Sequence, residues 1–174
     1  MSFKKPSPAS DTVYVSYIAA TPEKIWTALT GAEFTRQYFF GLQIESDWRV
    51  GSVVKYFRPD GVLDISGKII RCDPPRALAY TWHIESDPLT AKLPDSIVTF
   101  ELEPLGAVVR LTLIEAHPDL PDERLLEGGR RGWPAILSGL KTLMESGQSL
   151  PPFDMTYLQQ GGVEMRRVIE ELKL

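Results

Sequence analysis

The chain has 174 residues, of which 43% are hydrophobic and 24% charged, and its formal net charge is −4. These values are typical of one globular domain and exclude fibrous and largely disordered classes. The basic doublets are scattered, so nucleic-acid binding is not expected, and no segment approaches the roughly 20 apolar residues of a membrane span. The single cysteine, Cys72, excludes an internal disulfide and a cysteine-based metal site, and we expect a cytoplasmic protein with no metal or cofactor.

The N-terminal part predicts one strand followed by two short helices. Residues 1–10 are polar and are expected to form a flexible N-terminus. Residues 11–20 have apolar side chains on both faces of a predicted strand. Thr21 then offers a capping hydroxyl ahead of a proline and a glutamate, which is the usual start of a helix. Gly31 ends this helix, and residues 33–40 predict a second one.

Between residues 45 and 116 the pattern changes to short alternating runs separated by turn residues, which is typical of an antiparallel meander. Pro74 and Pro75 end one strand, and the next strand places Tyr80 and Trp82 on one face. Adjacent aromatic side chains on one face of a sheet must be buried away from water, either by a helix that packs on them or by a bound molecule. The identity of that cover is the main functional question.

The C-terminal part predicts one long helix and one short one. A helical stripe includes Trp133 and Leu137, but the glycines before them and Pro134 predict a kink near Trp133 or two helical pieces. Residues 147–174 are expected to be a linker and a short amphipathic helix at 162–173. This helix must dock, either on its own domain or on a second subunit, so a monomer and a homodimer both stay open.

Several segments resemble one family. Residues 21–30, Thr-Pro-Glu-Lys-Ile-Trp-Thr-Ala-Leu-Thr, resemble the first-helix signature of the activator-of-heat-shock-protein-90-ATPase-like family of the SRPBCC (START/Bet v 1-like) superfamily. Gly67, Asp73-Pro74-Pro75-Arg76 and Tyr80-Thr81-Trp82 resemble its central strands, and Gly132-Trp133 resembles its last helix. The resemblance covers about residues 11–146 and implies an α+β helix-grip fold. In that fold a curved antiparallel sheet of about six to seven strands wraps a long C-terminal helix, with two short helices after the first strand.

The resemblance also implies a largely apolar cavity between the sheet and the long helix, which holds a small molecule in many members of the superfamily. The side chains expected to line it are Trp26, Phe39, Tyr56, Tyr80, Trp82, Phe100, Leu111, Trp133 and Leu137. We therefore predict a non-catalytic carrier or sensor of a small hydrophobic molecule. Two alternatives stay open: a cyclase- or dehydratase-like enzyme that uses Tyr56 or Tyr80 in the same cavity, and a protein-interaction module of the stress or co-chaperone type.

The ionisable residues of the predicted strands give no catalytic set. By alternation with Trp82, His83 is expected to point outward, and His117 is expected in a loop. Glu101, Arg110 and Glu115 are assigned to a solvated outer face of the sheet, as is Asp64, with Glu101 paired to Arg110. The sequence thus predicts binding rather than catalysis.

Overall fold

In the computed structural model of the protein the described residues are 11–174, so the expected flexible N-terminus, 1–10, lies outside them. The elements in chain order are β1 (Thr12–Ile18), α1 (Pro22–Thr30), α2 (Ala32–Tyr38), β2 (Gln43–Ser46), β3 (Val53–Phe57), β4 (Leu63–Asp73), β5 (Ala77–Ile84), the 3₁₀ turn η1 (Thr90–Lys92), β6 (Ser96–Leu105), β7 (Val108–Ala116), the 3₁₀ turn η2 (Glu123–Leu126), α3 (Glu127–Ser146) and α4 (Met155–Leu172).

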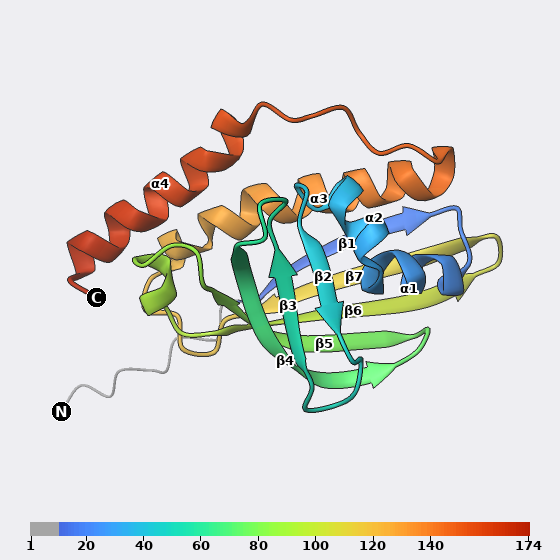
Figure 1. Ribbon diagram of the computed structural model, residues 1–174, viewed down its shortest axis with the longest axis horizontal. Helices are drawn as coiled ribbons and strands as arrows, with labels where there is room; N and C mark the ends of the chain where they lie inside the picture. The colour runs from blue at the N-terminus through green and yellow to red at the C-terminus, as the bar shows by residue number, and fades with distance from the viewer. Residues whose placement is uncertain (1–10) are drawn as a thin grey trace.

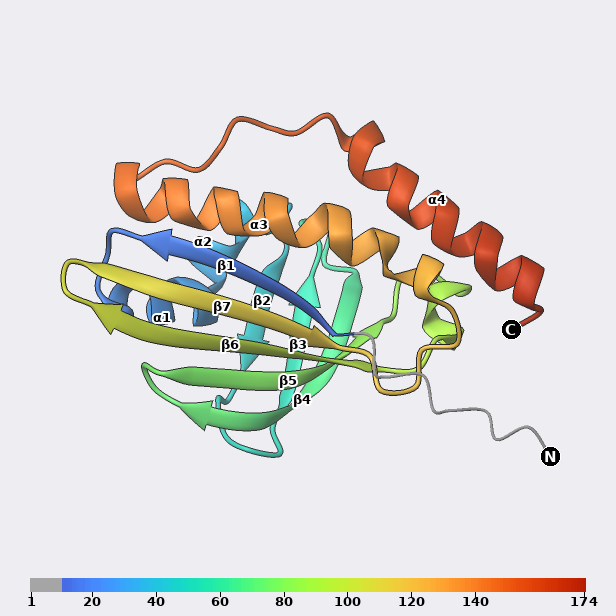
Figure 2. The same cartoon turned by 180° about the vertical axis from the view of Figure 1, so that it is seen from behind.

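The strands form one seven-stranded antiparallel sheet in the order β1-β7-β6-β5-β4-β3-β2. The sheet curves around α3, and α1 and α2 connect its two edge strands, β1 and β2 (Figures 1 and 2). The predicted α+β helix-grip fold is therefore confirmed.

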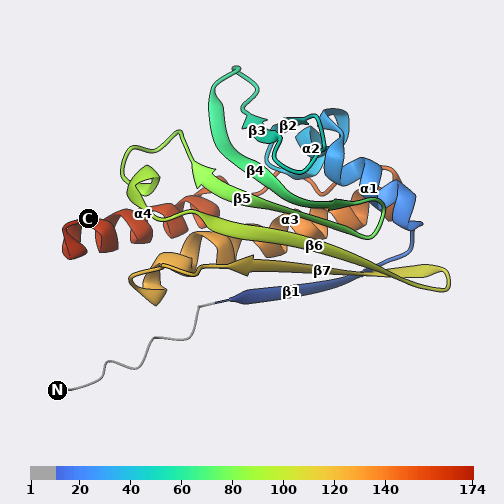
Figure 3. The ribbon, with the colours of Figure 1, turned by 90° about the horizontal axis from the view of Figure 1, so that it is seen from below.

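The sharpest bend of the sheet lies along β4, which turns away from β5 toward β3 (Figure 3). Its register with β5 shifts between Ile69 and Arg71. A Cβ atom on Gly67 would overlap the carbonyl oxygen of Thr81 in β5, so only glycine fits this close approach. The bend lets the sheet close around one side of α3.

The start of α1 follows the predicted capping pattern. Thr21 Oγ1 accepts a hydrogen bond from the backbone N–H of Lys24 at 3.3 Å, and Pro22 occupies the first turn. At its end, the N–H of Gly31 donates to the carbonyl of Thr27 at 2.9 Å. These local signals fix the two ends of α1, and its buried residues Ile25, Ala28 and Leu29 pack it into the main core.

The predicted alternative of two helical pieces divided near Trp133 is wrong. The turn η2 leads directly into α3, which continues through Pro134 to Ser146 as one helix. Trp133 and Leu140 are buried against the sheet, and this packing outweighs the hydrogen bond that Pro134 cannot donate. Tertiary contact, rather than local propensity, makes the helix continuous.

The last helix is longer than predicted: it begins at Met155 rather than at residue 162. Asp154 caps it by accepting from the N–H of Thr156 at 2.9 Å. Gly161, expected in a linker, lies inside the helix where α4 crosses α3, and a Cβ atom there would lie 3.1 Å from the Glu127 carbonyl oxygen. The close crossing explains the glycine.

The apolar face of α4 docks on its own chain. Met165, Val168 and Ile169 are buried together with Leu125 of η2 in a small cluster separate from the main core. The alternative in which these side chains contact a second subunit is therefore not supported. Arg166 of the same helix pairs with Asp87 at 2.7 Å, before η1, so α4 bridges two segments far apart in the sequence.

Candidate functional site

Three aromatic side chains from different elements meet at one end of the grip. Phe39 follows α2, Trp82 lies on β5 and Trp133 lies on α3. The ring centroids of the two tryptophans are 5.2 Å apart, and Phe39 contacts Trp133 edge-on at 5.7 Å. These rings lie between the main hydrophobic core, which the sheet and α3 enclose, and a cavity that the same three rings line.

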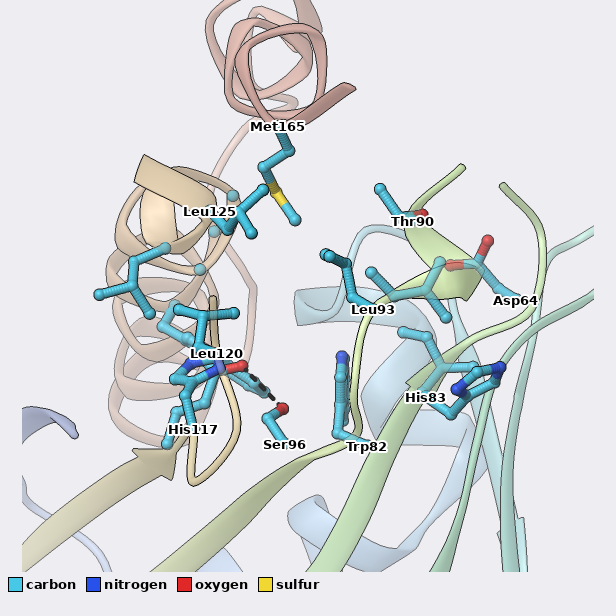
Figure 4. Close-up of a pocket in the computed structure, with 18 of the residues that line it drawn as sticks. Asp64, Trp82, His83, Thr90, Leu93, Ser96, His117, Leu120, Leu125 and Met165 are labelled. Atoms are coloured by element: carbon cyan, nitrogen blue, oxygen red, sulfur yellow. Dashed lines mark hydrogen bonds and ion pairs between the residues drawn. The ribbon is translucent and has the colours of Figure 1, made fainter. Parts of the chain in front are cut away.

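The cavity has a volume of about 280 Å³ and lies between the ends of β5 and β6, η2, the first turns of α3, and α4. In Figure 4, Met165 lies opposite Trp82, and Leu125 and Leu93 face each other across the space. The other apolar side chains of the lining are Phe39, Phe40, Leu42, Ile65, Ile84, Leu120, Leu126, Trp133 and Ile136. The volume lies near the lower limit of ordinary ligand pockets, about 300–1,000 Å³, and suits a small molecule.

A buried carboxylate forms part of this apolar wall. Glu115, at the end of β7, is 6% exposed. Its Oε2 accepts a hydrogen bond from the indole Nε1–H of Trp133 at 2.8 Å, and its Oε1 accepts one from Ser96 Oγ at 3.2 Å. A Cβ atom on Gly129 would lie 2.6 Å from Oε2, so the glycine allows α3 to approach the carboxylate.

His117 lies beside this carboxylate. Its Nε2 is 3.5 Å from Glu115 Oε2, its side chain is largely buried, and Nε2 makes no hydrogen bond within residues 11–174. Figure 4 shows His117 next to Ser96 on the same side of the cavity. The cavity therefore contains a carboxylate, an imidazole and a hydroxyl close together in an otherwise apolar wall.

The opposite side of the cavity carries a second polar group, formed by Asp64 and His83, both of which were expected on the outer side of the sheet (Figure 4). His83 Nδ1 is 2.8 Å from Asp95 Oδ1. Asp64 accepts a hydrogen bond from Arg58 Nε at 3.0 Å. Each of these groups has a charged or titratable partner outside the cavity, which distinguishes them from Glu115.

Six of the nine predicted cavity residues do not line the cavity. Tyr56 and Tyr80 are each 1% exposed, and their hydroxyl oxygens are 2.6 Å apart, so they hydrogen-bond to each other. Burial raises the pKa of both phenols. Three more, Phe100, Leu111 and Leu137, are buried core residues, and Trp26 is partly buried against the same core. Phe39, Trp82 and Trp133 line the cavity.

The assignment of Glu115 to the outer face of the sheet is wrong. Val109, Leu111 and Leu113 are all buried, and Glu115 continues the same alternation, so it faces inward. The expected pair of Glu101 and Arg110 is wrong as well, because the register places Arg110 opposite Glu103, at 3.7 Å. The alternation along β7 was the signal in the sequence that identifies Glu115.

Within residues 11–174, no group of three or more His, Cys, Asp or Glu side chains is arranged to hold a metal ion. None of the described helices combines the length and apolar character needed to cross a bilayer.

A curved sheet that grips a long helix and leaves a cavity at one end defines the chain as a helix-grip protein. The chain belongs to the family of activator of Hsp90 ATPase homolog 1-like proteins, whose family model matches residues 19–145. This confirms the family resemblance of the sequence. No curated protein matches the chain.

Solved structures share the fold. CalU16 from Micromonospora echinospora is 22% identical, with a TM-score of 0.64 over 95% of this chain and 94% of that one. MLL2253 from Mesorhizobium loti is 25% identical, with a TM-score of 0.65 over 78% and 97%. The Aha1 dimer from Colwellia psychrerythraea is 20% identical, with a TM-score of 0.63 over 80% and 99%.

Proposed function

We propose that this protein binds a small hydrophobic molecule in the cavity formed by β5, β6, η2, α3 and α4, as a non-catalytic carrier or sensor in the cytoplasm. The observation that supports the proposal is the cavity itself, about 280 Å³ in volume and lined mostly by apolar and aromatic side chains. A bound apolar molecule would replace water on these surfaces, which is the usual source of affinity in such pockets. Membership of the family fits a ligand-binding role.

Native mass spectrometry of the freshly purified chain, before and after denaturation, tests the proposal. We expect a small apolar molecule to leave on unfolding, and the same spectra give the number of subunits. An empty spectrum, together with no thermal shift from a panel of hydrophobic compounds, would contradict the proposal and favour an interaction module.

A pair of glycine substitutions sharpens this experiment. Gly132 on α3 lines the cavity, and a Cβ atom there would contact nothing within 4 Å, so Gly132→Leu is expected to fill the space without distorting the helix. Gly162→Leu on α4 is the matched control, because its Cβ atom is equally free and it does not line the cavity. Both changes remove a helical glycine that costs about 1 kcal/mol. Only Gly132→Leu should abolish binding.

The second candidate is a cyclase- or dehydratase-like enzyme. The contact between Glu115 and His117 favours it, because a carboxylate and an imidazole 3.5 Å apart can transfer protons in the cavity. Tyr56 and Tyr80 do not fill this role, since both are buried in the core away from the cavity. If the bound molecule is a substrate, wild-type protein should convert it with loss of water. His117→Phe should then bind it without conversion, and binding with no conversion by wild type would eliminate this candidate.

A further inference from the structure

We propose that the molecule bound in this cavity is a hydrophobic amine and that Glu115 binds its ammonium group. The inference deepens the proposed function and rests on it, because it defines the chemical class of the ligand. It is drawn from the charges and hydrogen-bond donors of the cavity wall.

The permanently charged side chains of the cavity lining are all acidic. Among the described residues that line the cavity are two carboxylates, Asp64 and Glu115, and two histidines, His83 and His117, but no lysine or arginine. An anionic ligand would therefore find no permanent positive charge. A cationic ligand would find two carboxylates.

The two carboxylates differ in how well they are compensated. Asp64 is paired with Arg58 at 3.0 Å and also accepts from the hydroxyl of Ser86. Glu115 has no lysine or arginine partner within residues 11–174, and its hydrogen bonds come from the neutral donors Trp133 and Ser96. A carboxylate buried to this degree normally has a cationic partner.

His117 does not supply that partner through a hydrogen bond. His117 Nε2 is 3.5 Å from Glu115 Oε2, and this imidazole nitrogen makes no hydrogen bond among the described residues. Each carboxylate oxygen can accept more than the single bond it receives, so Glu115 has capacity for a donor from a ligand. An ammonium group in the cavity would supply both the missing charge and a donor.

The rest of the wall fits the apolar body of such a molecule. The rings of Trp82 and Trp133, beside Phe39, offer aromatic surface against which an apolar ring can pack. Glu115 is the one lining carboxylate without a lysine or arginine partner among residues 11–174, and the same residues contain no metal-binding group. These two facts indicate one organic ammonium rather than a divalent metal ion. The recognised group is therefore a monovalent cation attached to an apolar body.

Three compounds with one apolar body test this inference: 1-naphthylmethylamine, 1-naphthylmethanol and 1-naphthylacetate, which are cationic, neutral and anionic at neutral pH. Binding to the full chain is measured by isothermal titration calorimetry. The amine should bind about tenfold more tightly than the alcohol, because both partners of its hydrogen bond to Glu115 are charged, whereas only the carboxylate is charged in the bond from the alcohol. The acetate should bind most weakly.

The variant Glu115→Gln should lower the affinity of the amine by about tenfold, to near that of the alcohol, and should change the affinity of the alcohol much less. Glu101→Gln is the matched control, since it removes the same charge from an exposed position on β6. It should preserve the preference for the amine. Circular dichroism of each variant verifies the fold, and if Glu115→Gln does not fold, the ratio of the three affinities in wild type still decides.

The outcomes separate this inference from the proposed function. Equal affinities for the amine and the alcohol, or tighter binding of the acetate, would overturn the inference and leave apolar binding intact. A preference for the amine that persists in Glu115→Gln would overturn the role of Glu115. Absence of binding by all three, with no molecule released on denaturation, would overturn both proposals.

Discussion

The hydroxyl pair of Tyr56 and Tyr80 gives the sharpest prediction for stability. Both side chains are 1% exposed, and their oxygens are 2.6 Å apart. Tyr56→Phe leaves the Tyr80 hydroxyl buried without a partner, and Tyr80→Phe does the same to Tyr56. Each single change should lower the free energy of unfolding by about 1–3 kcal/mol, the cost of one unsatisfied buried polar group. The double variant removes both hydroxyls and should be nearly as stable as wild type.

Urea unfolding, followed by tryptophan fluorescence, measures the four free energies of this double-mutant cycle. The expected coupling energy equals the sum of the two single losses, about 2–6 kcal/mol, and is well above the few tenths typical of independent sites. Additive losses would refute the reasoning, because they would mean that neither hydroxyl depends on the other. Binding should be unchanged in all three variants, since neither tyrosine lines the cavity.

Three further predictions follow from burial and close contact. Burial raises the pKa of Tyr38, Tyr56 and Tyr80 above 10.0, so above pH 10 the unfolded state loses these protons before the folded state does. The free energy of unfolding should therefore be unaffected below pH 10 and should fall above it. In an ultraviolet titration these three phenols should ionise only when the protein unfolds. Gly67→Ala places a methyl group against a β5 carbonyl and should cost at least about 2 kcal/mol in thermal or urea unfolding; an unchanged midpoint would contradict the tight bend. Ile169→Ala, at a position with 0% exposure, should weaken α4 docking by about 2–5 kcal/mol, and hydrogen exchange should rise in α4 but not in the sheet.

Much of the fold could be predicted because its signals are local. The cap at Thr21, the turn residues between strands and the alternation along each strand specify the elements and their order. The errors arise where tertiary contact overrides local propensity. Pro134 and the neighbouring glycines read as breaks, but α3 continues through them because its buried face packs on the sheet. The sequence predicts that Gly161 lies in a linker, but in the structure it lies in α4 and allows α4 to cross α3 closely.

The candidate site could be predicted only in part, for a different reason. The sequence identified aromatic side chains between the sheet and the long helix, including Trp82 and Trp133, but not which end of that space is open. That depends on η1, η2 and α4, whose arrangement rests on contacts between distant segments such as the pair of Arg166 and Asp87. The inward orientation of Glu115 could have been inferred from the alternation along β7, but a charged residue is usually assigned to a solvent-exposed face. The hydrogen-bond partners of Glu115, Ser96 and Trp133, are also distant from it in the sequence.

The separate docking of α4 has a consequence for protein engineering. Its apolar contacts form a cluster of their own, apart from the core between the sheet and α3, and residues 147–154 join it to the rest of the chain. One wall of the cavity, at Met165, therefore belongs to a module that the grip does not need for its own core. Substitutions at Met165, the α4 residue that lines the cavity, would reshape the pocket without changing the main core, so new ligand preferences could be selected on an unchanged sheet and α3.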